Sequence, residues 1–279
     1  MKKVRLTSIL LSGTMAATMF GVAATAAEVD AGPGALPAVS GINGKIELGA
    51  GWSDIDDLGD DALLRGGGSL SFPVGDMFGI QADVMVTEIV DDTRIGGDLH
   101  FFTRDPNSYL LGVVGGVLTA DDADAFFIGP EAELYLENFS VEAWGGYMNT
   151  DFDGAGSEDD AFGQIDLGFY ATENLRFTVG ASSYAGFETG RLGMEWQIGE
   201  LGLPLSLTAD ARFGEDDFTA VSAGFKIYFG AEDKSLIRRH REDDPPNRAK
   251  DVAEGAGDGL VCIPNDTNNY CGSIFGTAQ

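Results

Sequence analysis

The chain has 279 residues and a formal net charge of −28, with 17 basic residues against 45 acidic ones. Such an excess of acid excludes recognition of nucleic acid, whose phosphates require a basic surface. The chain is also 44% hydrophobic and contains 18 phenylalanines, which argues against disorder in its central region.

The first 26 residues are predicted to be a secretory signal peptide. A basic start precedes an apolar stretch from Leu6 to Phe20, and small residues follow it. This order is typical of a cleaved signal, with cleavage near Ala26 or Ala27. The alternative, an uncleaved inner-membrane anchor, is disfavoured because no basic stop-transfer flank follows. Residues 27–42 are then expected to form a periplasmic N-terminal segment.

The region from residue 43 to 229 alternates between apolar and polar residues in about twelve segments of membrane-strand length. No segment after the signal has the roughly twenty apolar residues that a membrane helix needs. A chain of this kind can enter a membrane only as a closed barrel, in which all strand hydrogen bonds are satisfied. We therefore predict an all-β fold, a closed antiparallel transmembrane β-barrel of about 12 strands, within a range of roughly 10–14. The expected strands are 44–53, 63–73, 77–88, 94–104, 108–119, 125–137, 138–149, 161–171, 174–184, 190–198, 204–213 and 218–229.

The connections between these segments form two alternating sets. Tight turns such as PVGDM, RDPNS and EN alternate with longer acidic loops such as SDIDDLGDDA, ADDADA and TDFDGAGSEDD. Bacterial barrels place short turns in the periplasm and longer loops outside, so the first strand should start, and the last should end, on the periplasmic side. A soluble β-sandwich is the alternative, but it would not require a signal peptide or charges on the opposite face of nearly every strand.

Most charges of the barrel region fall on the inward side, because Arg or Lys facing lipid at mid-membrane would cost about 2–4 kcal/mol. They indicate either a wet channel with selective wall charges or a filled barrel in which ion pairs satisfy one another. A barrel of about twelve strands lies between filled small barrels and open large ones, and we expect a modest pore. The predicted pore-lining residues are Lys45, Glu47, Arg65, Asp83, Asp98, His100, Arg104, Glu131, Glu133, Glu142, Asp166, Arg176, Arg191, Glu195, Asp210, Arg212 and Lys226.

The strand expected at residues 108–119 departs from this pattern. Leu110, Val114 and Leu118 have inward parity there, among Gly112 and Gly116. An apolar inward wall indicates that something packs against it, either a loop folded into the lumen or a neighbouring subunit. The sequence leaves both open, and the oligomeric state with them.

The outer loops carry many acids and almost no base. Solvated acidic loops resist aggregation, but they also give the mouth a negative potential that favours cations. Carboxylates such as Asp56, Asp57, Asp60 and Asp61 are candidate ligands for divalent cations. The segment DFDGAGSEDD fails the EF-hand template because Ala155 occupies its third ligand position. No specific metal site and no cofactor are predicted.

The chain has no GxSxG, HExxH or Walker motif, and its two histidines are His100 and His240. His100 has inward parity, with Asp98 two residues away on the same side. We interpret it as a polar group of the lumen network and not as part of a Ser–His–acid triad. We therefore predict no catalytic residues and no enzyme activity.

The closing strand contains Ser222, Gly224, Ile227 and Phe229 in a spacing that resembles the insertion signal of outer-membrane barrels. The chain as a whole resembles bacterial outer-membrane β-barrel proteins of the porin-like family. This resemblance implies passive diffusion of small hydrophilic solutes or ions across the outer membrane. Outer-membrane lipid, lipopolysaccharide and the barrel-assembly machinery would be partners. The acidic charge predicts a preference for cations, and the alternative function is a structural or surface-interaction barrel with a filled lumen and no transport.

Residues 230–279 extend beyond the closing strand. They comprise a charged stretch interrupted by Pro245-Pro246, an EGAGDG linker and the segment CIPNDTNNYC. Cys262 and Cys271 are the only cysteines and should form a disulfide in an oxidising periplasm. We expect a periplasmic tail with a disulfide-closed loop. The basic run at 238–241 is either a contact for the cell wall or simply a solvated stretch.

Overall fold

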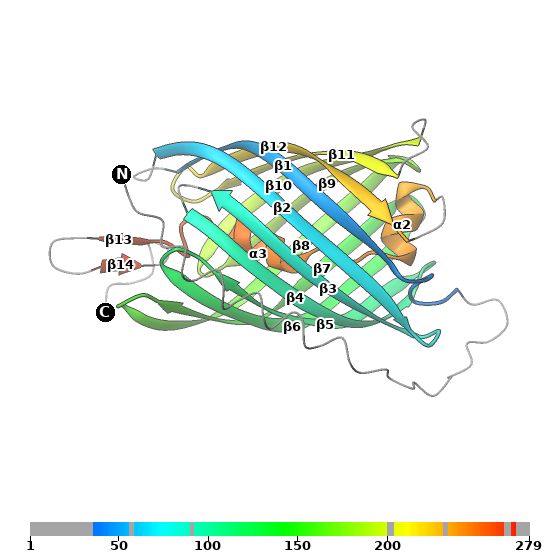
Figure 1. Cartoon of the computed structure of the whole chain (residues 1–279), viewed down its shortest axis with the longest axis horizontal. Helices are drawn as coiled ribbons and strands as arrows, with labels where there is room; N and C mark the ends of the chain where they lie inside the picture. The colour runs from blue at the N-terminus through cyan, green and yellow to red at the C-terminus, as the bar shows by residue number, and fades with distance from the viewer. Residues whose placement is uncertain are drawn as a thin grey trace.

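The computed structural model describes residues 36–55, 59–89, 92–199, 204–230, 234–264 and 269–271. Within them, twelve antiparallel strands form a closed barrel in which β1 pairs with β12 (Figure 1). The strands are β1 (Asn43–Ile55), β2 (Gly59–Val74), β3 (Phe78–Ile89), β4 (Asp92–Asp105), β5 (Tyr109–Thr119), β6 (Ala123–Leu136), β7 (Phe139–Phe152), β8 (Gly156–Thr172), β9 (Leu175–Tyr184), β10 (Phe187–Ile198), β11 (Leu205–Gly214) and β12 (Thr219–Phe229). The predicted fold and strand number are confirmed. The predicted signal peptide, Asp56 and Asp57 lie outside the described residues.

The closing pair of strands shows how alternation separates lipid from lumen. Leu48 lies opposite Phe225, and the next pair along, Glu47 and Lys226, carries opposite charges. Because successive side chains of a strand point to opposite faces, the apolar pair faces outward and the charged pair inward. Phe229, the last residue of the predicted insertion signal, ends β12 opposite Gly44.

Several strands extend further at the loop end than the alternation predicted. β2 begins at Gly59 instead of residue 63, and β8 begins at Gly156 instead of residue 161. These extensions consist largely of acidic and small residues. Beyond the lipid a strand needs no apolar side, so ladder hydrogen bonds continue there without any alternating pattern.

The outer surface of the barrel carries the apolar side chains. Val84, Val117 and Leu192 are 61%, 60% and 52% exposed on three separate strands. A sandwich would have buried such a face against a second sheet, so this alternative is wrong. Aromatic rings pair near the tight turns, with Phe78 stacked on Phe101 at a centroid distance of 5.4 Å. Such rings form the girdle that anchors membrane barrels at the headgroup level.

The chain after β12 turns back into the barrel. Helix α2 (Leu236–Glu242) lies at the end where β12 finishes, and helix α3 (Arg248–Gly255) lies between the barrel walls (Figure 1). α3 contacts strands on opposite sides of the barrel, namely β3, β4 and β5 on one side and β9 and β10 on the other. Strands β13 (Cys262–Pro264) and β14 (Asn269–Cys271) form a small hairpin closed by the predicted Cys262–Cys271 disulfide. Of the helices that the structure describes, none is long and apolar enough to cross a membrane.

The position of this tail corrects the sequence analysis. A tail outside the barrel was expected, but residues 248–256 are buried, with only Lys250 partly exposed. The physical reason is that the inward wall contains both an apolar patch and charged side chains. α3 covers the apolar patch and supplies oppositely charged partners for several of those side chains. The described part of the N-terminal segment also folds over the tight-turn end of the barrel, where Val39 packs with Phe102, Leu110 and Tyr135.

Candidate functional site: the barrel lumen

Residues 234–261, called the plug below, run through the lumen from the tight-turn end to the loop end. At the turn end the Ile237 N–H donates to the Glu173 carbonyl, at 3.0 Å, in the turn between β8 and β9. Arg241 donates to the Leu136 carbonyl, at 3.0 Å, in the turn between β6 and β7. α2 therefore covers the mouth formed by the tight turns.

The plug leaves the lumen at the opposite mouth. The Cys262 N–H donates to Asp122 Oδ2, at 3.3 Å, in the loop between β5 and β6. Gly259 lies so close to the connection between β9 and β10 that an added Cβ would be 2.8 Å from the Ala185 carbonyl oxygen. The disulfide hairpin therefore follows the plug at the loop end, on the far side of the barrel from β12's last residue.

Local sequence explains why a helix forms inside the lumen. Pro245 and Pro246 precede it, and proline cannot continue the preceding helix α2. Asn247 is the N-cap of α3, and its side chain accepts a hydrogen bond from the Lys250 N–H at 2.9 Å. Gly257 follows the helix with a φ of +50°, a conformation that glycine adopts without strain.

One side of α3 is apolar. Ala249, Val252 and Ala253 are completely buried, as are Ala256 and Leu260 after the helix. They pack in one cluster with side chains of β3 and of β5–β8, called the apolar wall below: Met85, Val114, Leu118, Phe127, Trp144, Met148 and Phe162. The apolar inward parity of Val114 and Leu118 thus has its explanation, because the occupant is the chain's own tail.

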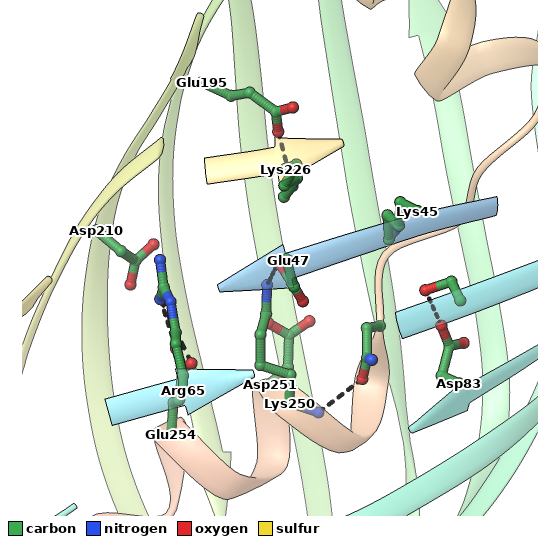
Figure 2. Close-up of polar contacts among 12 residues, drawn as sticks. Lys45, Glu47, Arg65, Asp83, Glu195, Asp210, Lys226, Lys250, Asp251 and Glu254 are labelled. Carbon is green, nitrogen blue, oxygen red and sulfur yellow. Dashed lines mark hydrogen bonds and ion pairs between the residues drawn. The ribbon is translucent and has the colours of Figure 1, made fainter. Parts of the chain in front are cut away.

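The other side of the plug is charged and faces β10–β12, β1 and β2. The facing residues, called the charged wall below, are Lys45, Glu47, Arg65, Arg191, Asp210, Arg212 and Lys226. The ion pairs between plug and charged wall include Lys45–Asp244 (2.6 Å), Arg65–Glu254 (3.3 Å), Lys250–Glu47 (3.1 Å), Arg191–Asp251 (3.2 Å), Arg212–Glu254 (3.5 Å) and Arg212–Asp251 (3.6 Å). Figure 2 shows Glu47 and Arg65 of the charged wall beside Lys250 and Glu254 of α3. Buried charges require such partners, since an unpaired charge in the lumen would be costly.

Every predicted pore-lining residue has an inward side chain. Some also pair with each other, as Lys226 does with Glu195 at 2.7 Å and Arg176 does with Glu142. Arg104 lies 4.9 Å from the centre of the Phe102 ring, near the turn end. The charges therefore line a filled lumen, in which they hold a segment of protein and one another.

Arg94 is a lumen residue that was not among the predicted pore-lining residues. Its side chain is completely buried and donates to the carbonyls of Ala253 and Gly257 in the plug, at 2.5 Å each. Its Nε also pairs with Asp92 at 2.6 Å. The sequence contained one signal of this orientation. Arg94 lies six residues before the inward His100 in β4, and residues an even number of positions apart point to the same face of a strand.

A second polar cluster lies on β3 and β4. His100 Nε2 lies 2.9 Å from Asp98 Oδ1 and 3.1 Å from Asp83 Oδ2, and His100 Nδ1 lies 2.8 Å from Glu131 Oε1. Glu131 reaches His100 from β6 across Gly112 of β5, where an added Cβ would be 2.9 Å from the same oxygen. The missing side chain of Gly112 therefore permits this contact.

The other histidine belongs to the plug. His240 Nδ1 lies 2.9 Å from the Tyr170 hydroxyl, and His240 Nε2 lies 3.6 Å from Glu195 Oε2. The described contacts of both histidines are thus with carboxylates and tyrosine hydroxyls, and not with a serine that a triad would use as nucleophile.

A polar cavity of about 80 Å³ remains between the plug and the charged wall. Glu47, Lys226 and the plug residue Lys250 are among its lining residues. A water molecule needs roughly 10–15 Å³, so the cavity has room for a few waters. Sites for drug-sized ligands measure about 300–1,000 Å³, so the cavity is too small for a solute of that size.

No known family profile matches the chain, and no curated protein matches it. Solved structures do match. The KdgM porin in complex with disordered oligogalacturonate has a TM-score of 0.50 and 7% identity, covering 67% of this chain and 99% of the porin. The NanC porin matches with a TM-score of 0.45 and 7% identity, covering 67% of this chain and all of that one.

An outer membrane phospholipase A from Escherichia coli matches with a TM-score of 0.46 and 14% identity, covering 72% of this chain and 94% of that one. Likeness at such low identity concerns the fold and not the activity. The closed strand order, the apolar outer face and the aromatic girdle, together with the likeness to the KdgM porin, identify the structural class. The chain has the fold of bacterial outer-membrane β-barrel proteins of the porin-like kind.

Proposed function

We propose that the protein is a porin-like outer-membrane channel for small hydrophilic solutes or ions, held closed by its own plug. The observation that carries this proposal is the filled lumen. With the plug in place, the cavity between the plug and the charged wall accommodates only a few water molecules. Movement of the plug would open a lumen bounded by the strongly polar charged wall. The tight-turn end would face the periplasm, as in other bacterial barrels.

The polar side of the plug supports a closure that can open. Ion pairs beside a water-sized cavity exchange for water at lower cost than a dry apolar contact does. A barrel of this strand number also lies between filled small barrels and open channels. Displacement of a short segment would therefore convert one state into the other without change to the strand ladder.

We further propose that the open channel prefers cations. Exposed acids gather at the loop end, including Asp60, Asp124, Asp153 and Glu158. A mouth of one sign concentrates ions of the opposite sign and repels those of its own. The preference would weaken as salt is raised, because exposed charges are screened.

The alternative function is a sealed barrel with a structural or surface-interaction role. The apolar contact of Val252 and Ala253 with the barrel favours it, since a dry interface holds a plug firmly. In that case the barrel would serve to place the disulfide hairpin at the loop end, and solute would not pass.

Two truncated chains separate these functions in a planar lipid bilayer. A chain ending at Gly230 lacks the plug, whereas a matched control ending at Val261 retains the plug and lacks only the segment after it. We expect the first to conduct in large, stable steps with a cation-selective reversal potential, and the control to behave like the full chain. Folding of both is checked by heat-modifiable migration on a gel.

The outcome separates the two proposals. If the full chain shows rare openings of the size seen without the plug, the plug is a gate. A full chain that stays silent under all voltages, next to a conducting truncated chain, would favour the sealed barrel. A folded truncated chain that does not conduct would contradict the channel.

A further inference from the structure

His100 lies in a cluster with the carboxylates of Asp83, Asp98 and Glu131. Three carboxylate oxygens lie near its ring nitrogens, but an imidazole has at most two N–H groups to donate. Asp83 and Asp98 lie directly opposite each other on β3 and β4. Like charges in this position repel, and burial in the lumen strengthens the repulsion. A protonated imidazole has one N–H at Nε2, yet two carboxylate oxygens lie about equally near it. Within the described residues, neither Nε2 nor Asp98 Oδ1 has a hydrogen bond of acceptable geometry.

These two atoms converge with a third, Asp83 Oδ2, which already accepts a hydrogen bond from Gln81 Nε2 at 2.9 Å and has a second lone pair free for a metal. His100 Nε2, Asp98 Oδ1 and Asp83 Oδ2 lie within 4.8 Å of one another, and all three side chains are buried. A zinc ion with bonds of 2.0–2.1 Å in tetrahedral geometry separates its ligand atoms by about 3.3 Å. The observed separations of 2.9 and 3.1 Å from the imidazole nitrogen would need to widen by only a few tenths of an ångström.

The remaining atoms of these side chains are already held in place. The Ala249 N–H donates to Asp98 Oδ2, and the Ser69 hydroxyl donates to Asp83 Oδ1. Glu131 accepts from the other imidazole nitrogen. A carboxylate on the second nitrogen of a metal-binding histidine is a recurring feature of metal sites, since it fixes the ring and raises its basicity.

We propose that His100, Asp83 and Asp98 bind one divalent transition-metal ion, with zinc as the best fit. The donor set of one imidazole nitrogen and two carboxylate oxygens suits zinc, cobalt or manganese. Calcium is disfavoured because it takes six to eight oxygen ligands. The ion replaces the second proton of the imidazole and compensates the two facing carboxylates. This inference does not depend on whether the barrel conducts.

The site is coupled to the plug through its supporting contacts. Asp98 binds the backbone at the start of α3, and Glu131 lies 3.8 Å from the Arg248 guanidinium in the same helix. A metal ion at this position would orient the carboxylates of Asp98 and Glu131 for these contacts. Bound metal would therefore hold the plug in the lumen more firmly.

The test uses the full chain refolded in detergent with Zn²⁺ or Co²⁺ and then dialysed against a weak chelator. We expect about one zinc per chain by mass spectrometry, and for cobalt the visible absorption bands of a low-symmetry site. His100→Gln should lose nearly all of the bound metal. Glu131→Gln should retain the ligands but bind about 10–100-fold more weakly.

His240→Gln is the matched control, because that histidine lies elsewhere in the lumen among tyrosines, and it should keep the metal. If His100→Gln does not fold, Asp98→Asn provides the same comparison. A wild-type chain that retains no more metal than His100→Gln or Asp98→Asn would overturn the proposal. Equal loss from His240→Gln, or no weakening by Glu131→Gln, would also overturn it.

Discussion

The plug meets the two halves of the barrel in physically different ways. Towards the apolar wall, α3 presents Ala249, Val252 and Ala253, which are completely buried and need no partner of fixed geometry. Towards the charged wall it presents Lys250 and Glu254, each of which depends on an opposite charge at about 3 Å. The first contact gains free energy from area removed from water, and the second mainly avoids the penalty of an unpaired buried charge.

This difference suggests a division of roles within one short helix. The apolar contact supplies most of the net stability of the closed lumen, about 25 cal/mol for each Å² of apolar surface buried. The ion pairs add less net free energy, because desolvation offsets much of their attraction. They do fix the direction and depth of the helix, since each pair is satisfied at one position only. Substitutions on the two sides should therefore differ in size of effect.

The strongest test of this comparison is Val252→Asp, with Val252→Ala as its matched control. A carboxylate against the apolar wall should cost about 3–5 kcal/mol and expel α3, because the nearby guanidinium groups of Arg94 and Arg248 already pair with Asp92 and Asp251. The alanine variant loses only methyl groups, worth about 2 kcal/mol, and should keep the plug in place. Trypsin cleavage after Arg248 and Lys250, mapped by mass spectrometry, measures expulsion. Protection of both bonds in a folded Val252→Asp barrel would contradict the assigned role of the apolar wall.

An intermediate effect is expected from Glu254→Gln on the charged side. The amide keeps the shape of Glu254 but leaves Arg65 and Arg212 without the negative charge that both contact. We expect a loss of about 1–3 kcal/mol, seen as faster tryptic cleavage than in the wild type and slower than in Val252→Asp. Arg238→Gln is the control, since this side chain is more than half exposed and its pair with Glu242 contributes at most about 1 kcal/mol. Equal cleavage of the two glutamine variants would mean that the buried pairs do not hold the plug.

Much of the barrel was predictable because its physics is local. Lipid on one side and polar lumen on the other impose a period of two, so twelve strands and the inward charges could be derived residue by residue. Leu110, Val114 and Leu118 also indicated that something packs against the inward wall, either a loop in the lumen or a neighbouring subunit. The acidic strand ends were missed because no lipid imposes a pattern on them.

The occupant was not identified because its partners are distant in sequence. Lys250 and Glu47 are 203 residues apart, and no local pattern links them. One signal was present, however. Ala249, Val252, Ala253 and Ala256 follow the i, i+3, i+4, i+7 spacing of an amphipathic helix, which implies an apolar surface for it to meet. Matching this stripe to the apolar inward wall of β5 would have placed the plug.

The smallest predicted effect concerns the loop end, where the stability of the docked plug should depend on pH. Asp258 lies after α3, where burial and the nearby Asp216 raise its pKa from 3.8 to about 6, with Glu215 and Arg94 also near. A carboxyl whose pKa is raised in the docked state takes up a proton on docking. Docking therefore gains stability as the pH falls from about 6 to about 4, and loses it as the pH rises through 6.

Amide hydrogen exchange in residues 256–261 measures this effect when each wild-type rate is divided by the rate of Asp258→Asn at the same pH. The ratio removes the intrinsic pH dependence of exchange. We expect the wild type to exchange a few-fold faster than the variant at pH 7, because its charged carboxylate repels Asp216, and equally fast near pH 4.5. A ratio that does not change with pH would show that this carboxyl does not titrate with docking. The end of the plug would then be held by its carbonyl contacts with Arg94 and by the apolar contacts of Ala256 and Leu260, and the charged side of the plug would end at Glu254.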